Sequence, residues 1–471
     1  MISQRRATWI CGTLLLGITD ISSATQPPDV VTSDGSANTA MGTNALISNG
    51  TSDWNTAAGW DSLYTNTTGI TNSAFGAQGL FANTTGAQNA AFGAFSLEEN
   101  TTGNNNAAAG AAALRDNTTG SDNSSVGEES TSWNSTGSEN AALGTNALRY
   151  NQTGSHNTAI GSQSLVGVGY TTMSEGNTAV GYSSLFAITT GSNNAAIGMD
   201  SLLANTTGSE NAALGSEALH FNTTGGNNTA TGYGALQANT NGASNTASGR
   251  LALGANTTGY RNTSLGALSE YLNTTGNSNT ALGLESLYSN RSGSNNIALG
   301  VQAGYNLTSG SNNIYLGNPG LASESGVTRI GTSGAQAAVY VAGINSTHVT
   351  GATVVVTSSG QLGVLASSER YKTAIRPLGS ASHKLAQLRP VSFHLKNEPD
   401  GALQYGLIAE QVQKVYPDLV IHGETGTVEG VRYDELAPLL LNEVQQQQRT
   451  LQEQAHQLAM MQRELDELRR R

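Results

Sequence analysis

Cysteine is almost absent from this sequence of 471 residues, which contains only Cys11. Disulfide frameworks and thiolate metal sites need several cysteines, so the sequence excludes both. Charged residues make up only 11% of the chain and aromatic residues 6%, whereas 57 residues are glycine. We therefore do not expect a conventional globular core over most of the chain, and small side chains stacked in register are the alternative source of stability.

Clustered basic charge is also lacking, because 21 Lys and Arg face 33 Asp and Glu and the formal net charge is -12. Proteins that bind nucleic acid neutralise phosphates with grouped basic side chains, so we expect no nucleic-acid partner. Long apolar runs are lacking too. The longest early run, Trp9–Ile18, is shorter than the roughly 20 residues that cross a bilayer, and we expect no transmembrane anchor.

The N-terminus has the order of a secretory signal. Arg5 and Arg6 precede the apolar run, and small residues end at Ala24 before a pair of prolines. We interpret residues 1–24 as a signal peptide and expect the mature chain to begin near Thr25. The predicted location is extracellular or at the cell surface, with a virion tail fibre as the alternative.

The sequence does contain a long repeat. Asparagine recurs every 17 residues from Asn38 to Asn157 and again from Asn177 to Asn313, after a three-residue insertion near Tyr170. The consensus of the seventeen units is N-T-A-x-G-x-x-A-L-x-x-N-T-T-G-x-x. Helices are excluded because two glycines per unit cost too much in a helix, and a disordered linker would not hold an apolar pair at a fixed phase. The repeat predicts stacked coils, that is, a parallel β-roll or solenoid shaft over residues 35–320.

One unit shows what we expect of every coil. We expect Gly215 and Gly225 to take positive φ at corners, and Ala213, Leu214 and Leu219 to point inward. Equivalent asparagines should form side-chain ladders along the stack. At about 4.8 Å per coil, the shaft would be about 80 Å long. The repeats resemble the head repeats of trimeric autotransporter adhesins, a resemblance that implies a left-handed parallel β-roll of three chains.

The repeats offer few signs of a ligand. The N-x-T triplets match glycosylation acceptors, but we interpret them as a turn that recurs in each coil. Ice binding is another interpretation of repeated threonine, although it needs a flat threonine ladder. Tyr170, Trp54, Trp60 and Trp133 are the candidates for contact with a receptor, for example a glycan or another cell-surface molecule. No cofactor and no metal site is expected.

The pattern changes after residue 320. Residues 321–366 alternate apolar and β-branched residues and predict a β-rich neck, either a β-prism or a small sandwich. From residue 367, helical periodicity predicts a small α+β domain over residues 367–435. A heptad pattern then predicts a trimeric coiled coil over residues 436–471, with a single amphipathic helix as the alternative. The two core positions of the heptads are occupied by Val444, Leu451, Leu458 and Leu465 and by Leu440, Gln447, Gln454, Met461 and Leu468.

The last domain carries several motifs in order: SSERYKTAIRPL, YGLIAEQVQKVYPDLV and VRYDELAPLLLNEV. With the heptads that follow, they closely resemble the intramolecular chaperone auto-processing domain at the end of phage tail spikes and tail fibres. The resemblance implies a homotrimer whose last domain templates folding of the fibre and then cuts itself off. It also implies that Ser367 is the nucleophile and Lys372 the base, with Arg370 between them. Ser368 stands where the family usually has Asp.

This chemistry is reasonable for the residues present. A serine hydroxyl needs a base to remove its proton, and a lysine serves when burial or a neighbouring cation disfavours its charged form. Cleavage before Ser367 can pass through a five-membered ring onto Ala366, whereas cleavage after Ser367 needs another group or a neighbouring chain. His383, His394 and His422 have no spacing typical of a triad or a metal site.

We therefore predict a trimeric fibre, resembling a tail fibre or an adhesin, that acts as a self-cleaving serine endopeptidase. The alternative is a structural or adhesive trimer that does not cut.

Overall fold

The computed structural model describes six stretches of the chain: residues 32–168, 175–336, 338–342, 353–357, 359–423 and 426–470. They form two compact units that divide between Val339 and Tyr340, and each unit is considered by itself. The predicted signal peptide over residues 1–24 and the insertion residue Tyr170 lie outside the described residues.

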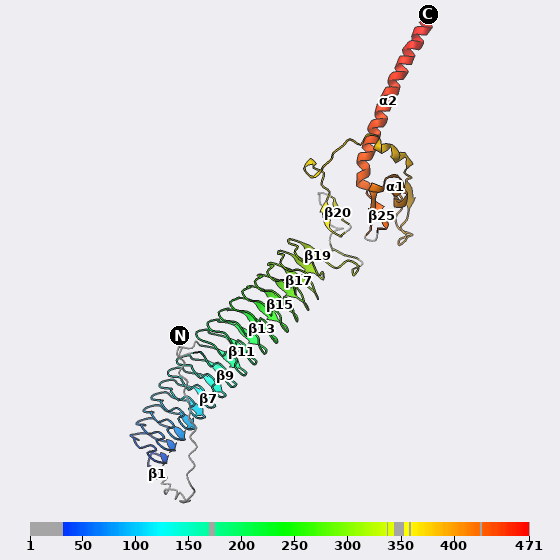
Figure 1. Cartoon of the computed structure of the whole chain (residues 1–471). Helices are drawn as coiled ribbons and strands as arrows, with labels where there is room; N and C mark the ends of the chain where they lie inside the picture. The colour runs from blue at the N-terminus through cyan, green and yellow to red at the C-terminus, as the bar shows by residue number, and fades with distance from the viewer. Residues whose placement is uncertain are drawn as a thin grey trace, which may run out of the picture. The chain divides into compact units, whose positions relative to one another are not determined.

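The first unit is a stack of coils in which each coil contributes one short strand (Figure 1). Neighbouring strands pair in parallel and in register, so that Ala213 lies beside Ala196 of the coil before and Ala230 of the coil after. The predicted mainly β fold, a parallel solenoid of seventeen repeats, is confirmed. The strands are β1 (Thr32–Ser33), β2 (Thr39–Met41), β3 (Thr56–Ala58), β4 (Ser73–Phe75), β5 (Ala90–Phe92), β6 (Ala107–Ala109), β7 (Ser124–Val126), β8 (Ala141–Leu143), β9 (Thr158–Ile160), β10 (Thr178–Val180), β11 (Ala195–Ile197), β12 (Ala212–Leu214), β13 (Thr229–Thr231), β14 (Thr246–Ser248), β15 (Thr263–Leu265), β16 (Thr280–Leu282), β17 (Ile297–Leu299), β18 (Ile314–Leu316) and β19 (Thr328–Ile330).

The three-residue insertion does not interrupt the sheet. Thr158 in β9 pairs with Thr178 in β10, which lies 20 residues further along the chain. The backbone N–H of Asn177 donates to Oδ1 of Asn157 at 3.0 Å, as its equivalents do in other coils. The extra residues are therefore accommodated outside the strand, and the register of the shaft is kept.

The interior of the shaft is built from one alanine and one leucine per coil. Ala213 and Leu219 are fully buried, as predicted. The prediction that Leu214 points inward is wrong, because its side chain is 43% exposed. Successive side chains of a strand point to opposite faces, so only the middle residue of each three-residue strand can face the core.

The two glycines of each coil have different roles. Gly215 has φ +136°, as predicted for a corner. The prediction of positive φ at Gly225 is wrong. A Cβ atom at Gly225 would lie 2.3 Å from the carbonyl oxygen of Gly242 in the next coil and 2.6 Å from Oδ1 of Asn222. Glycine is needed there because adjacent coils approach too closely for a side chain.

Asparagine ladders run along the inside of the shaft, as predicted. In the first, the N–H of Asn72 donates to Oδ1 of Asn55 at 2.9 Å, and Nδ2 of Asn72 donates to the carbonyl of Gly86. In the second, Nδ2 of Asn83 donates to Oδ1 of Asn66 at 2.8 Å. These asparagines are buried, so the N-T-T-G tract is a structural turn whose amides satisfy the backbone of neighbouring coils.

Two coils interrupt the apolar core. In the coil of β7, Ser125, Ser130 and Thr131 take the places of the two core alanines and the leucine. In the coil of β15 the fully buried Glu270 takes the place of the leucine. The core is accordingly divided into three apolar segments, which end before β7, run from β8 to β14, and resume at β16.

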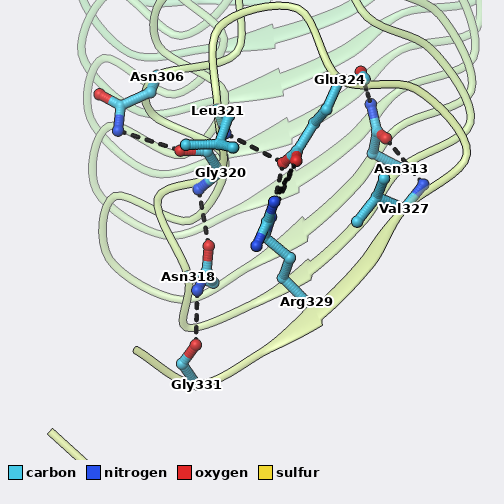
Figure 2. A network of polar contacts seen from close by, with 9 residues as sticks. All are labelled: Asn306, Asn313, Asn318, Gly320, Leu321, Glu324, Val327, Arg329 and Gly331. Atoms are coloured by element: carbon cyan, nitrogen blue, oxygen red, sulfur yellow. Dashed lines mark hydrogen bonds and ion pairs between the residues drawn. The ribbon is translucent and has the colours of Figure 1, made fainter. Parts of the chain in front are cut away.

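A polar cap closes the C-terminal end of the solenoid (Figure 2). Tyr315 is fully buried at the place of the core alanine and fills the end of the interior. Beyond it the coil shortens, since Ile314 pairs with Thr328, 14 residues later. The guanidinium of Arg329 donates to both carboxylate oxygens of Glu324, at 2.6 to 2.9 Å, and these bonds hold the pKa of Glu324 below its ordinary value. Repeat proteins need such a cap because their last coil has no neighbour.

The second unit is small and contains three hairpins and a long helix. Its apolar core brings together Val412, Leu419, Val420, Val431 and Leu439. The elements are β20 (Val354–Val356) paired with β21 (Leu362–Val364), the 3-10 helices η2 (Glu369–Tyr371) and η3 (Gly379–Gln387), β22 (Val391–Phe393) paired with β23 (Gln404–Gly406), α1 (Ala409–Val415), the 3-10 helix η4 (Pro417–Leu419), β24 (Val420–His422) paired with β25 (Val428–Val431), and α2 (Tyr433–Arg470).

Helix α2 is 38 residues long and extends beyond the remainder of its unit (Figure 1). Leu439 near its start packs into the small core, whereas every described residue from Leu451 onward is exposed. The heptad residues Val444, Leu451 and Leu458 are 58 to 64% exposed. The described residues include no helix with the length and apolar character needed to span a bilayer.

Candidate functional site

The predicted catalytic residues lie between β21 and η3, in a stretch with little regular structure. Ser367 and Ser368 follow the end of β21, and the single turn of η2 separates them from Lys372. Ser367, Ser368, Arg370 and Lys372 are all exposed. The chain is extended on both sides of the turn, with φ -66° and ψ 141° at Ser368 and φ -116° and ψ 142° at Lys372.

Local hydrogen bonds hold only the turn itself. The N–H of Tyr371 donates to the carbonyl of Ser368 at 3.1 Å, and the N–H of Lys372 donates to the carbonyl of Glu369 at 2.9 Å. The guanidinium of Arg370 lies over the ring of Tyr371, 4.8 Å from its centroid. The Arg370 charge is therefore directed at the neighbouring ring, a cation–π contact, and no ion pair of Arg370 is found among the described residues.

The single chain does not bring the two predicted catalytic groups together. No hydrogen bond joins the side chains of Ser367 and Lys372 among the described residues. A nucleophilic serine requires a base within about 3 Å of its hydroxyl. Ser367 and Lys372 are close in sequence but remain separate and solvated within one chain, so additional surface has to cover them before they act as a pair.

The histidines of this unit have separate structural partners. His383 contacts the side chain of Gln446 on α2, and Nδ1 of His394 lies 3.0 Å from the carbonyl of Gly401. Nε2 of His422 lies 3.4 Å from Nε2 of Gln413. In the described part of the chain, no group of three or more His, Cys, Asp and Glu side chains is arranged to hold a metal ion.

One polar cluster in this unit was not found from the sequence. Ser382 of η3 is fully buried; its Oγ donates to Oε2 of Glu443 at 2.9 Å and accepts from Nδ2 of Asn442 at 2.7 Å. The hydroxyl of Tyr416 donates to the carbonyl of Ala381 at 2.8 Å, and burial followed by the Glu443 charge raises the pKa of Tyr416. This cluster fastens η3 to the first turns of α2. No motif or spacing in the sequence marks it, because its members are 60 residues apart.

The tryptophans considered for receptor contact are spread along the shaft. Trp54 is 63% exposed and Trp60 is 53% exposed. Trp133 is half-buried, with the guanidinium of Arg115 5.5 Å above its ring and Tyr150 6.1 Å away. Their separate locations do not form a common pocket.

Comparison with known proteins places the C-terminal unit alone. No curated protein and no solved structure matches the chain. Residues 367–421 match the model of a peptidase family, S74, whose description is the chaperone of endosialidase, and the match begins at Ser367, so this is the family that the start of the C-terminal domain resembles.

Proposed function

We propose that the protein is a trimeric surface or tail fibre whose C-terminal domain directs assembly and then releases itself by cleavage at Ser367. The observation that carries the proposal is the order of the parts: a chaperone-of-endosialidase match begins at Ser367, directly after a long β-solenoid and its neck. A chaperone domain that precedes cleavage has a natural substrate in a shaft whose strands pair only across successive coils. The working location of such a fibre is outside the cell or on a virion.

Association begins with α2 in this proposal. Its heptad residues Val444, Leu451, Leu458 and Leu465 form an apolar seam that is more than half exposed in one chain. Such a seam is buried when parallel helices pack as a coiled coil. Gln447 and Gln454 occupy core positions of the same seam, where polar residues fix register and the number of strands at a cost in stability.

Cleavage follows once neighbouring chains cover the Ser367 stretch. Lys372 accepts the hydroxyl proton of Ser367, and the resulting oxygen attacks a carbonyl carbon. If that carbonyl belongs to Ala366, the peptide bond breaks as the acyl group moves from nitrogen to oxygen through a five-membered ring, and water hydrolyses the ester. If the cut falls after Ser367, the attacking group comes from elsewhere, since a four-membered ring would otherwise be needed.

A fibre that assembles without cutting is the second candidate. The observation in its favour is that Ser367 and Lys372 are exposed and unjoined in one chain. In that case the same domain would nucleate the trimer and remain attached as its cap.

The test compares three full-length variants with the wild type on a denaturing gel. We expect Ser367→Ala and Lys372→Met to leave the chain intact while it still associates, because each removes one reacting group without changing α2. Ser368→Ala is the matched control and should still cut.

Sequencing of the released fragment should give a first residue of Ser367 or Ser368. Uncut wild-type trimers would favour the second candidate. Continued cutting of Ser367→Ala would remove Ser367 from its proposed role.

A further inference from the structure

One face of the shaft is apolar and uncharged along its whole length. We define the strand face as the first and third residues of strands β2 to β18, whose middle residues point into the core. Fifteen of its seventeen third positions carry apolar side chains, and the exceptions are Thr231 and Ser248. The apolar third residues are Met41, Ala58, Phe75, Phe92, Ala109, Val126, Leu143, Ile160, Val180, Ile197, Leu214, Leu265, Leu282, Leu299 and Leu316.

These side chains are exposed in the single chain. Phe92, Leu143 and Leu299 are 48 to 51% exposed, although each sits at the centre of a continuous apolar row. The rings of Phe75 and Phe92 stack at 5.1 Å with an interplanar angle of 4°, which makes the row flat at that point. Soluble proteins rarely leave apolar rows of this length in water.

Charge is excluded from the strand face but not from the other sides of the shaft. No residue of β2 to β18 is charged. Ion pairs join Arg115 with Asp116 and Arg149 with Glu129, and all four residues lie in the segments between strands. The distribution separates an uncharged face from charged sides, which is typical of a surface that is buried in an assembly.

We propose that the strand face is where the shaft packs against second and third copies of this chain. Side chains on this face recur once per coil, and only a partner with the same rise per coil can keep contact along the full row. A second copy has that rise. Three copies related by a threefold axis along the shaft would bring equivalent strands together at equal heights.

The size of the face fits this occupant. Seventeen strands at about 4.8 Å spacing, each about 10 Å long, give a face of about 800 Å² per chain. This equals the area that each partner buries in a stable protein–protein interface, about 800 Å². First-position residues are mostly Thr, Ser and Ala, so neighbouring sheets could approach closely beside the larger third residues.

This inference rests on the proposed trimer but concerns a different surface from α2. The probe is a water-soluble maleimide applied to single-cysteine, full-length proteins in a Cys11→Ser background. Leu214→Cys places the thiol on the strand face, and Phe221→Cys places it on the same coil outside that face. The native side chains are 43% and 52% exposed, so the pair is matched in one chain.

In the assembled protein we expect Leu214→Cys to react at least about tenfold more slowly than Phe221→Cys, because access of reagent to the thiol limits its modification. Equal rates in a trimeric fraction would overturn the proposed surface and leave the trimer and its cleavage in place. Wild-type chains that remain monomers would overturn both.

A second experiment uses charge in place of cysteine. The double variant Leu143→Asp with Leu214→Asp should reduce the trimeric fraction of shafts after the C-terminal domain has separated, whereas Phe221→Asp should leave it unchanged. Unaltered association of the double variant would contradict the proposed surface. Cleavage on a denaturing gel, read in the same samples, reports separately on the C-terminal domain.

Discussion

The shaft and the C-terminal unit use the same chain in opposite ways. In the shaft, nearly every coil buries its alanine, its leucine and its asparagines against the coils above and below. In the described residues from 359 onward, only six side chains are buried, and they are Ser382, Val412, Leu419, Val420, Val431 and Leu439. A single chain therefore satisfies the interior of the shaft, whereas the C-terminal unit leaves most of its apolar surface in water.

This difference indicates where association has to begin. A coil of the solenoid gains contacts only from its neighbours along the same chain, so the shaft cannot align three chains before it has folded. The exposed seam of α2 is available as soon as the helix forms, since helices need only local contacts. We infer that the C-terminal unit supplies the alignment and the shaft supplies the durable structure.

The largest expected effect comes from breaking the seam. Leu458→Pro removes a helix hydrogen bond and should interrupt α2 at a cost of about 3 kcal/mol per chain. We expect monomers by light scattering and intact chains on a denaturing gel, although residue 458 is far from Ser367 in sequence. Leu458→Met keeps the apolar seam and should behave as the wild type. Cut trimers of Leu458→Pro would locate assembly elsewhere.

A glycine in the shaft tests whether its coils are held by their own close approach. Gly225→Ala would put a Cβ atom 2.3 Å from the Gly242 carbonyl oxygen, so the coils have to separate. We expect a loss of about 1–3 kcal/mol or more of unfolding free energy, measured by denaturant. Gly35→Ala is the control, because no heavy atom lies within 4 Å of a Cβ atom there. Equal stability of both variants would argue against close packing of the coils.

The buried Glu270 makes the shaft sensitive to pH. Burial raises the pKa of Glu270 from an ordinary 4.5 to about 8, with the Asn279 side chain opposing the shift. Below pH 4.5 the carboxyl is neutral in both the folded and the unfolded chain. Between pH 4.5 and 8 it ionises only in the unfolded chain, so stability should fall by up to about 1.4 kcal/mol per pH unit as pH rises.

Glu270→Gln keeps the size and removes the titration. Denaturant midpoints measured at pH 5 and pH 8 should differ for the wild type and converge for Glu270→Gln, apart from the effects of other groups. A wild-type shaft that is equally stable at both values, relative to the variant, would show that solvent reaches Glu270.

The smallest expected effect concerns the cap. Arg329→Met leaves the Glu324 carboxylate without its guanidinium partner, and we expect a local loss of about 1 kcal/mol. Amide exchange should quicken at Val327, whose N–H donates to Oδ1 of Asn313, and should be unchanged in the middle of the shaft. Arg250→Met is the control, because the exposed Arg250 has no ion pair. Protection at Val327 that survives Arg329→Met would assign the cap to Tyr315 alone.

The sequence predicted the shaft well because its period is strict. The 17-residue spacing of asparagine sets the length of each coil, and the buried Ala213 and Leu219 follow from their recurrence at one phase. It did not predict that Leu214 faces outward, because a core position and an interface position carry the same apolar residues. Strand alternation, which decides between them, depends on where each three-residue strand begins.

The candidate site was predicted less completely. The motif around Ser367 identified the family, but sequence spacing cannot state whether Ser367 and Lys372 meet, since they are separated only by the turn of η2. The cluster of Ser382 and Glu443 escaped notice because its contacts arise from tertiary packing across 61 residues.

The central claim is that cleavage depends on assembly, and it is tested by separating freshly produced full-length protein by size and measuring the chain masses in each fraction. We predict that trimeric fractions contain chains cut beside Ser367 and that monomeric fractions contain only intact chains. Chains cut beside Ser367 in protein that has never associated would contradict the claim.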